Sequence, residues 1–191
     1  MTARRYRYTL FVLSLCSLFL VGCDEDDSAA TANSGQIQEI ASEYENLDAE
    51  TYGKMMEAQN QKLMQKMQEM MTRQKEPEPR DEVRAVKKIS DEIYAISEDI
   101  AKLQLEQHKN MLATPGLTES RRRALQENLS LLRESIQHIQ TIRPLLNALY
   151  AETEKTTPDL ETMEDLQKKI SSLSNKPMEI GLKVQSNLMI P

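Results

Sequence analysis

Apolar residues recur every three or four positions along most of the chain beyond residue 36, a period typical of amphipathic α-helices. The clearest stretch spans 80–113, where the apolar seam consists of Val86, Ile89, Ile93, Ile96, Ile100 and Leu103. Residues 119–156 carry a second seam, made of Leu125, Leu129, Leu132, Ile136, Ile139, Ile142, Leu146 and Leu149. Each seam predicts a long helix whose apolar stripe is covered by a neighbouring helix or by a partner chain.

Prolines and small polar residues divide this pattern into segments. The sequence Glu76-Pro77-Glu78-Pro79 is expected to end a first helix that starts near Gln36, with Gly53 weakening its middle so that two helices could meet near 48–53. Residues 114–118 form a turn in which Thr118 is available as an N-cap for the next helix. Pro144 lies inside the second seam and is expected to bend that helix without ending it.

A fourth, shorter helix is expected after Thr157-Pro158-Asp159, with Thr157 as its N-cap, and Asn175-Lys176-Pro177 is expected to stop it. Because the connections are short, successive helices should be antiparallel neighbours. The sequence therefore predicts an all-α fold, an elongated antiparallel up-and-down bundle or helical hairpin of three long helices plus a short fourth. The long helices should measure about 50–60 Å, and the helical domain should span residues 36–174.

The tail, residues 175–191, has two interpretations, and we expect it to be partly disordered or partner-binding. Residues 178–185 alternate apolar and polar side chains like a strand that would add to the sheet edge of a partner. Ile180, Val184 and Leu188 are also spaced as on one face of a helix, which would fold back onto the bundle.

The N-terminus has the three parts of a secretory signal. Three arginines, Arg4, Arg5 and Arg7, precede an apolar run from Leu10 to Val21. A helix of this length rises only about 18 Å, less than the roughly 30 Å hydrocarbon core, which disfavours a permanent membrane span. The run ends in Leu20-Val21-Gly22-Cys23, and this tetrapeptide resembles the lipobox of bacterial lipoprotein signals. The rest of the chain resembles no family.

The lipobox resemblance implies a location for the protein. Residues 1–22 would be removed, and Cys23 would carry acyl chains sufficient for stable membrane anchoring. Asp24 follows, and in lipoproteins of enteric-type bacteria an aspartate there keeps the protein in the inner membrane, facing the periplasm of the Gram-negative cell. Residues 23–35 are acidic and then small and polar, so we expect a flexible tether between the anchor and the helical domain.

Composition excludes several classes of function. Loss of the signal would change the net charge from −6 to −9, which argues against nucleic-acid binding. Cys23 would be the only cysteine and would be acylated, so neither a disulfide nor a thiolate metal site is expected. His108 and His138 should lie about 20 Å apart on the hairpin, too far to share a metal ion, at the surface or seam edge. With the acidic residues expected on polar faces, the sequence predicts neither an enzyme nor a cofactor.

Methionines between Met55 and Met71 are the most suggestive chemical feature. Met64, Met67, Met70 and Met71 have a spacing that would bring three thioethers onto one helix face. Thioethers are soft ligands for Cu(I) or Ag(I), so a soft-metal or oxidative-stress binding protein is the alternative function. Packing in an irregular core or an adaptable interface is the interpretation that we favour.

Arg121, Arg122 and Arg123 lie in the expected first turn of the third helix, where cations oppose the helix dipole. They are candidate contacts to an anionic partner surface, with pairing to Glu119 and Glu127 as the simpler alternative. The expected function is a membrane-anchored periplasmic helical module that binds another envelope protein, as an accessory or assembly factor. Self-association into a homo-oligomer through the apolar seams is a further alternative.

Overall fold

A computed structural model describes Tyr44 and residues 47–74, 76 and 78–189 of the chain. These residues form helices and no strands, which confirms the predicted all-α class. The helices are α3 (Ala49–Thr72), α4 (Pro79–Leu112), α5 (Glu119–Glu154), α6 (Leu160–Ser174) and α7 (Lys176–Leu188). The predicted signal, the whole tether of residues 23–35 with Cys23 and Asp24, and residues 36–43 of the expected helical domain lie outside the described residues.

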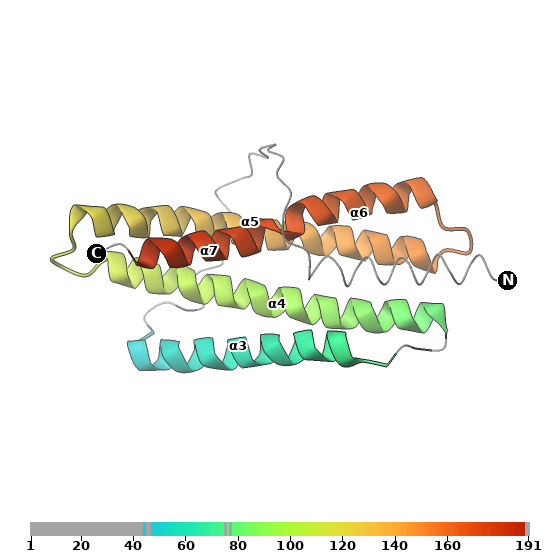
Figure 1. The fold of residues 1–191 in the computed structure, drawn as a ribbon, viewed down its shortest axis with the longest axis horizontal. Coiled ribbons are helices and arrows are strands. Elements are labelled where there is room, and N and C mark those ends of the chain that lie inside the picture. Colours follow the sequence, from blue (N-terminus) through green and yellow to red (C-terminus); the bar gives the residue numbers. More distant parts are fainter. Residues whose placement is uncertain (1–43, 45–46, 75, 77, 190–191) are drawn as a thin grey trace.

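The centre of the molecule is an antiparallel hairpin of α4 and α5 (Figure 1). Helix α3 packs against α4, while α6 and α7 follow one another along α5, so the helices form an elongated bundle. The 34 residues of α4 and 36 of α5 correspond to about 50 Å of helix, as predicted. Helix α3 has 24 residues and begins within the 48–53 range where the pattern allowed two helices to meet, while the expected start near Gln36 lies outside the described residues.

Local capping explains where α3 and α6 begin. The Asp48 side chain accepts a hydrogen bond from the Thr51 backbone N–H at 2.8 Å, so the described helix begins at residue 49. The prediction that Thr157 caps the fourth helix is wrong, because Asp159 is the N-cap of α6. Its carboxylate accepts from the Glu161 N–H at 3.1 Å and has two oxygens to offer, whereas a threonine has one hydroxyl.

Three further expectations about helix boundaries can be compared with the structure. Thr118 caps α5, as predicted, by accepting from the Arg121 N–H at 3.2 Å. Helix α5 continues through Pro144, also as predicted. The Asn175-Lys176-Pro177 sequence ends α6 but immediately begins α7, since a proline in a first turn removes no intrahelical hydrogen bond. The tail thus adopts the helical alternative, with Ile180 and Val184 buried.

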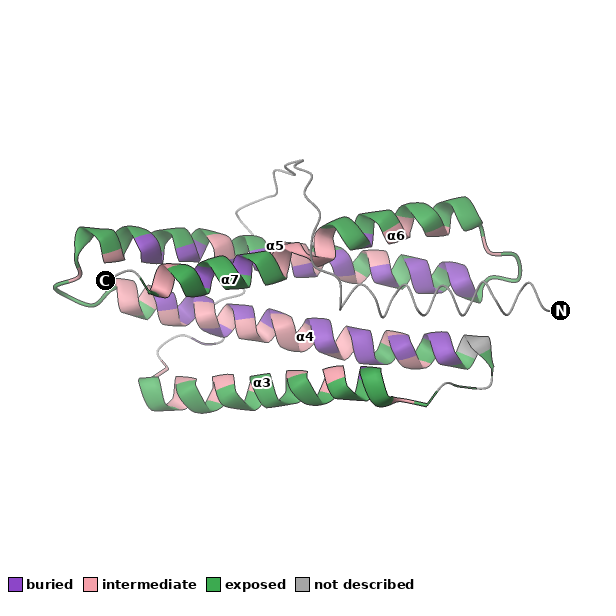
Figure 2. Ribbon diagram, in the orientation of Figure 1, coloured by how far each residue is buried: buried purple, intermediate pink, exposed green. Residues whose placement is uncertain are grey.

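The core consists of two apolar clusters arranged along the hairpin. All eight seam residues predicted on α5 are buried, and Figure 2 shows buried positions concentrated on α4 and α5. One cluster lies near the α5–α6 turn, where it joins α6 to the neighbouring ends of α3, α4 and α5. It includes Met70, Ile142 and Ile170. The other lies toward the α4–α5 turn and joins α4 and α5 to α7.

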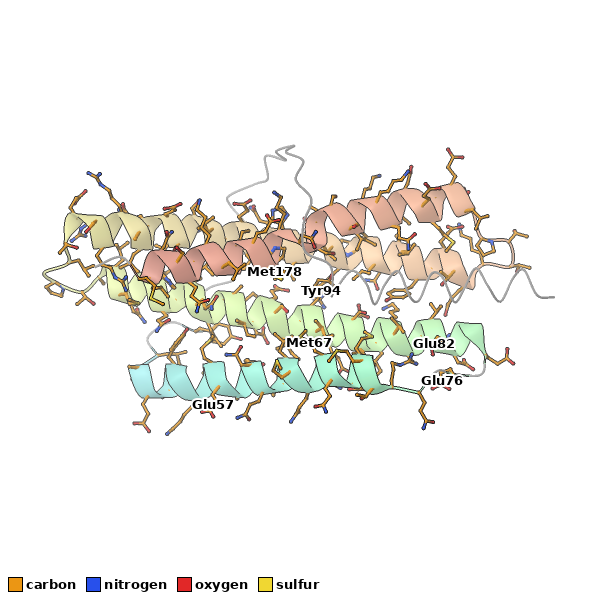
Figure 3. All side chains as sticks on the ribbon, in the orientation of Figure 1. Glu57, Met67, Glu76, Glu82, Tyr94 and Met178 are labelled. Carbon is orange, nitrogen blue, oxygen red and sulfur yellow. The ribbon has the colours of Figure 1, made fainter. Side chains whose placement is uncertain are left out.

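Two buried glutamates accept hydrogen bonds from the α3–α4 and α5–α6 connections, at the end of the bundle opposite the α4–α5 turn. Glu82 forms an ion pair with Arg73 and accepts from the Glu76 N–H at 2.8 Å, which closes the α3–α4 connection (Figure 3). Glu152 accepts from the Asp159 N–H at 2.8 Å and closes the α5–α6 connection. The expectation that the acidic residues lie on polar faces is therefore wrong for these two, whose charges are matched by hydrogen bonds, and also for the buried Glu98 and Glu106.

Candidate functional site

A buried polar network fastens α7 to the α4–α5 hairpin, inside an otherwise apolar contact. Asn128 of α5 is its centre and has none of its surface exposed. Its amide nitrogen donates to the Val184 carbonyl at 3.1 Å and lies 3.1 Å from Nε2 of His108. Its amide oxygen accepts from Nδ2 of Asn187 at 2.8 Å. We call His108, Arg121, Asn128 and Asn187 the α7 latch.

The hydrogen bonds of His108 define which of its two nitrogens carries the proton. Nδ1 lies 2.7 Å from the Gln104 carbonyl, which can only accept, so Nδ1 is the donor. Nε2 must then accept from the amide nitrogen of Asn128, whose orientation the Val184 carbonyl fixes. Burial lowers the pKa of His108 below its usual value, and the positive charge of Arg121 lowers it further. The expectation that His108 lies at the surface or seam edge is wrong, since only 1% of it is exposed.

Arg121 contacts the C-terminal end of α7. Its Nη1 donates to the Leu188 carbonyl at 2.6 Å. A cation in the first turn of α5 opposes the dipole of that helix, but α7 runs antiparallel, so the same cation lies where the dipole of α7 favours it. The unfavourable placement seen in the sequence is therefore compensated across the α5–α7 contact.

The three arginines have different surroundings. Arg123 pairs with Glu119 at 3.0 Å, as the simpler alternative proposed, while Arg122 is exposed. The other glutamate suggested as a partner, Glu127, pairs instead with Lys183 of α7 at 2.9 Å. Since Arg121 and Glu127 both contact α7, this part of α5 serves the docking of α7 at least as much as any external surface.

A second polar cluster lies between the two apolar clusters, on the α4–α5 contact. Glu98 is buried and contacts Lys102 at 2.8 Å, Gln140 at 3.1 Å and Arg143 at 3.2 Å. Burial opposes ionisation of Glu98, but the hydrogen bonds from Lys102 and Gln140 outweigh it, and its pKa falls below the ordinary value. The carboxylate of Glu98 is thus matched by two cations and one amide, and the contacts with Gln140 and Arg143 join α4 to α5.

The methionine tract is divided between core and surface. Met70 is buried in the apolar cluster of α3 to α6, and Met67 packs against it from the α4 side of α3 (Figure 3). Met64 and Met71 are 66% and 65% exposed. Of the four methionines, Met70 is thus turned into the core, Met67 is half-buried, and Met64 and Met71 face solvent.

Several large apolar side chains of the outer helices are exposed. Besides Met64 and Met71 they comprise Leu160 of α6, Met178 and Leu182 of α7, and Met189. A shallow hollow follows the outer face of α3 and is lined by Glu57, Asn60, Gln61, Met64 and Gln65. Single exposed apolar side chains are ordinary on a protein surface, whereas neighbouring ones on one helix face mark contact sites for other proteins.

Within the described residues, no three histidine, cysteine or acidic side chains come together in a way that could hold a metal ion. His138 lies elsewhere on α5 and its Nε2 is 3.4 Å from Glu134, so the two histidines do not meet. No helix in the described part of the chain is long and apolar enough to cross a membrane.

Comparison with protein family models, with curated proteins and with solved structures finds no match.

The sequence contained a signal for the latch that its apolar pattern obscured. His108 continues the spacing of Ala101 and Leu105 on α4, and Asn128 stands between Leu125 and Leu132 on α5. A polar residue at a position where the period demands an apolar one is expected to find a buried partner. What the sequence could not supply was that partner, because α7 is remote along the chain.

Proposed function

We propose that this chain is a membrane-anchored helical lipoprotein that binds another protein of the bacterial envelope. Acylation of Cys23 would provide the anchor, and Asp24 would favour the periplasmic face of the inner membrane. The lipobox resemblance supports the location, and the exposed apolar side chains of the outer helices support the binding role.

The observation that carries the binding role is the pair of exposed methionines on α3. Met64 and Met71 are two helical turns apart and lie on the same face, which the packing of α3 on α4 leaves uncovered. Methionine is flexible and polarisable, so a methionine face adapts to the shape of a partner. The apolar seams of α4 and α5, by contrast, are used inside the molecule, which makes the outer helices the better candidates for partner contact.

In-cell photocrosslinking tests this assignment. A photoreactive amino acid would replace Met64 or Met71 in one set of cells, and the exposed polar residues Gln126 or Ser130 of α5 in a matched control set. We expect a discrete adduct with one envelope protein from the α3 positions and little from the α5 positions. Equal crosslinking from both sets, or none from α3, would count against a binding role for this face.

The anchor is tested separately with the Cys23→Ser variant. Wild-type protein in growing cells should incorporate labelled palmitate and fractionate with membranes, whereas the variant should do neither. A control substitution of Cys16, which lies inside the predicted signal, should leave labelling intact. Labelling that persists in Cys23→Ser would refute the lipidation site without affecting the crosslinking result.

A further inference from the structure

The hydrogen bond between Asn128 and His108 in the α7 latch requires a neutral His108. The Gln104 carbonyl takes the proton of Nδ1, so Nε2 has only a lone pair to offer to Asn128. A second proton on the ring would point an N–H at the amide group of Asn128, which presents its own N–H to Nε2. Rotation of that amide would turn its oxygen toward Nε2, but would also set oxygen against the Val184 carbonyl, now 3.1 Å from the amide nitrogen.

The charged groups around His108 do not compensate for a second proton. Arg121 of α5 disfavours it by charge repulsion. The carboxylates on the neighbouring helices are engaged with lysines: Glu106 with Lys109 on α4, and Glu127 of α5 with Lys183 of α7. On α3, at the same end of the molecule, the Asp48 carboxylate caps the helix and Glu50 pairs with Lys54 at 2.5 Å in solvent.

We propose that α7 is a pH-sensitive helix, and that a proton on Nε2 of His108 breaks the α7 latch and lowers the occupancy of the docked state. Helix α7 docks on the apolar cluster of the α4–α5 hairpin, and undocking exposes this cluster. Its residues on the hairpin are Ala101, Leu105, Leu129, Leu132 and Ile136. The contribution of the His108–Asn128 hydrogen bond to docking is fully present above about pH 6.5, the ordinary pKa of histidine. It is lost as the pH falls through the lower pKa that His108 has in the folded protein. This device does not depend on the partner or the anchor proposed above.

Hydrogen–deuterium exchange of the full chain in detergent tests the proposal. Exchange of residues 176–188 would be followed from pH 7.5 to pH 4.5, after correction for the intrinsic pH dependence of exchange, with residues 139–149 as the internal reference. We expect the opening constant of α7 to rise roughly tenfold at acid pH, as for the loss of one buried hydrogen bond. The Glu127–Lys183 pair should persist over most of this range, because the pKa of Glu127 is lowered by its hydrogen bond to Lys183.

Three variants separate His108 from other acid effects. His108→Gln offers a neutral acceptor to Asn128, so the pH dependence of α7 exchange should disappear. His138→Gln changes the other histidine and should keep the wild-type dependence. Asn128→Asp sets an oxygen against the Val184 carbonyl whatever the charge of His108, so α7 should open more readily than in the wild type already at pH 7.5.

Two results would overturn the proposal. One is wild-type α7 exchange that stays constant relative to residues 139–149 down to pH 4.5. The other is the same pH dependence in His108→Gln as in the wild type. If His108→Gln fails to fold, nitrogen NMR of the wild-type imidazole replaces it. Protonation of His108 without any change in the α7 amides would then refute the mechanism.

Discussion

Replacement of Asn128 by alanine is the sharpest test of how α7 is held. The side chain is completely buried and makes contacts at 3.1, 3.1 and 2.8 Å with Val184, His108 and Asn187. A buried hydrogen bond contributes about 1 kcal/mol net, and a buried group left without a partner costs about 1–3 kcal/mol. Asn187 is only partly buried and can turn to water, so Nε2 of His108 and the Val184 carbonyl dominate the cost.

These contributions give an expected loss of about 3 kcal/mol in the free energy of docking α7. The loss of global stability is smaller if α7 undocks first, because undocking returns all three groups to water. The global loss therefore cannot exceed the net free energy of docking α7, to which burial of Ile180 and Val184 contributes about 1.5–3 kcal/mol for each side chain.

Two measurements separate local from global effects. Urea denaturation followed by circular dichroism gives the global free energy of unfolding, and amide exchange over residues 176–188 gives the local opening of α7. The control is Asn147→Ala, an exposed position on the same helix, which should change stability by less than about 0.5 kcal/mol. If Asn128→Ala leaves α7 exchange within twofold of the wild type, the network does not hold the helix.

Three further outcomes are expected. Glu98→Gln should lower the free energy of unfolding at pH 7 by about 1–3 kcal/mol, since Lys102 loses its buried counter-charge. Because the pKa of Glu98 is lowered in the folded protein, this difference should be complete above about pH 4.5 and vanish as the pH falls further, as urea titrations at several pH values would show. Gly116→Ala should cost about 1 kcal/mol in thermal unfolding, because φ there is +81° and no neighbouring atom lies within 4 Å to add a steric cost. Titration with Cu(I) should give no stoichiometric binding, since Met70 lies in the core, and binding that disappears in a Met64→Leu, Met67→Leu variant would instead support the soft-metal alternative.

Much of the fold followed from local pattern. The eight seam positions of α5 are all buried, and Thr118 caps that helix, because an apolar period and a capping side chain act over distances of a few residues. The errors arose where two local signals competed. Asp159 replaced Thr157 as the cap of α6, and a proline that was expected to end the helical domain began α7 instead.

The candidate site was much less predictable. Arg121 appeared in the sequence as a cation at an unfavourable helix end, and its explanation required the C-terminal end of α7, 67 residues away along the chain. The methionines were evident as a group, but which of them are exposed depends on how α3 rotates against α4. Helix rotation is decided by the packing of side chains from both partners, and one helix cannot specify it.

The sequence by itself therefore determined the helical class, the central hairpin and the lipobox resemblance, because each depends on periodicity or on a short contiguous motif. Only the tertiary structure decided that His108 and Asn128 are joined and that α7 completes their hydrogen bonds. The physical reason is that a buried polar group requires a partner of matching donor or acceptor character, without specifying where along the chain that partner lies. Folding α7 back along α5 supplied the Val184 carbonyl and Asn187 at the one place where both were needed.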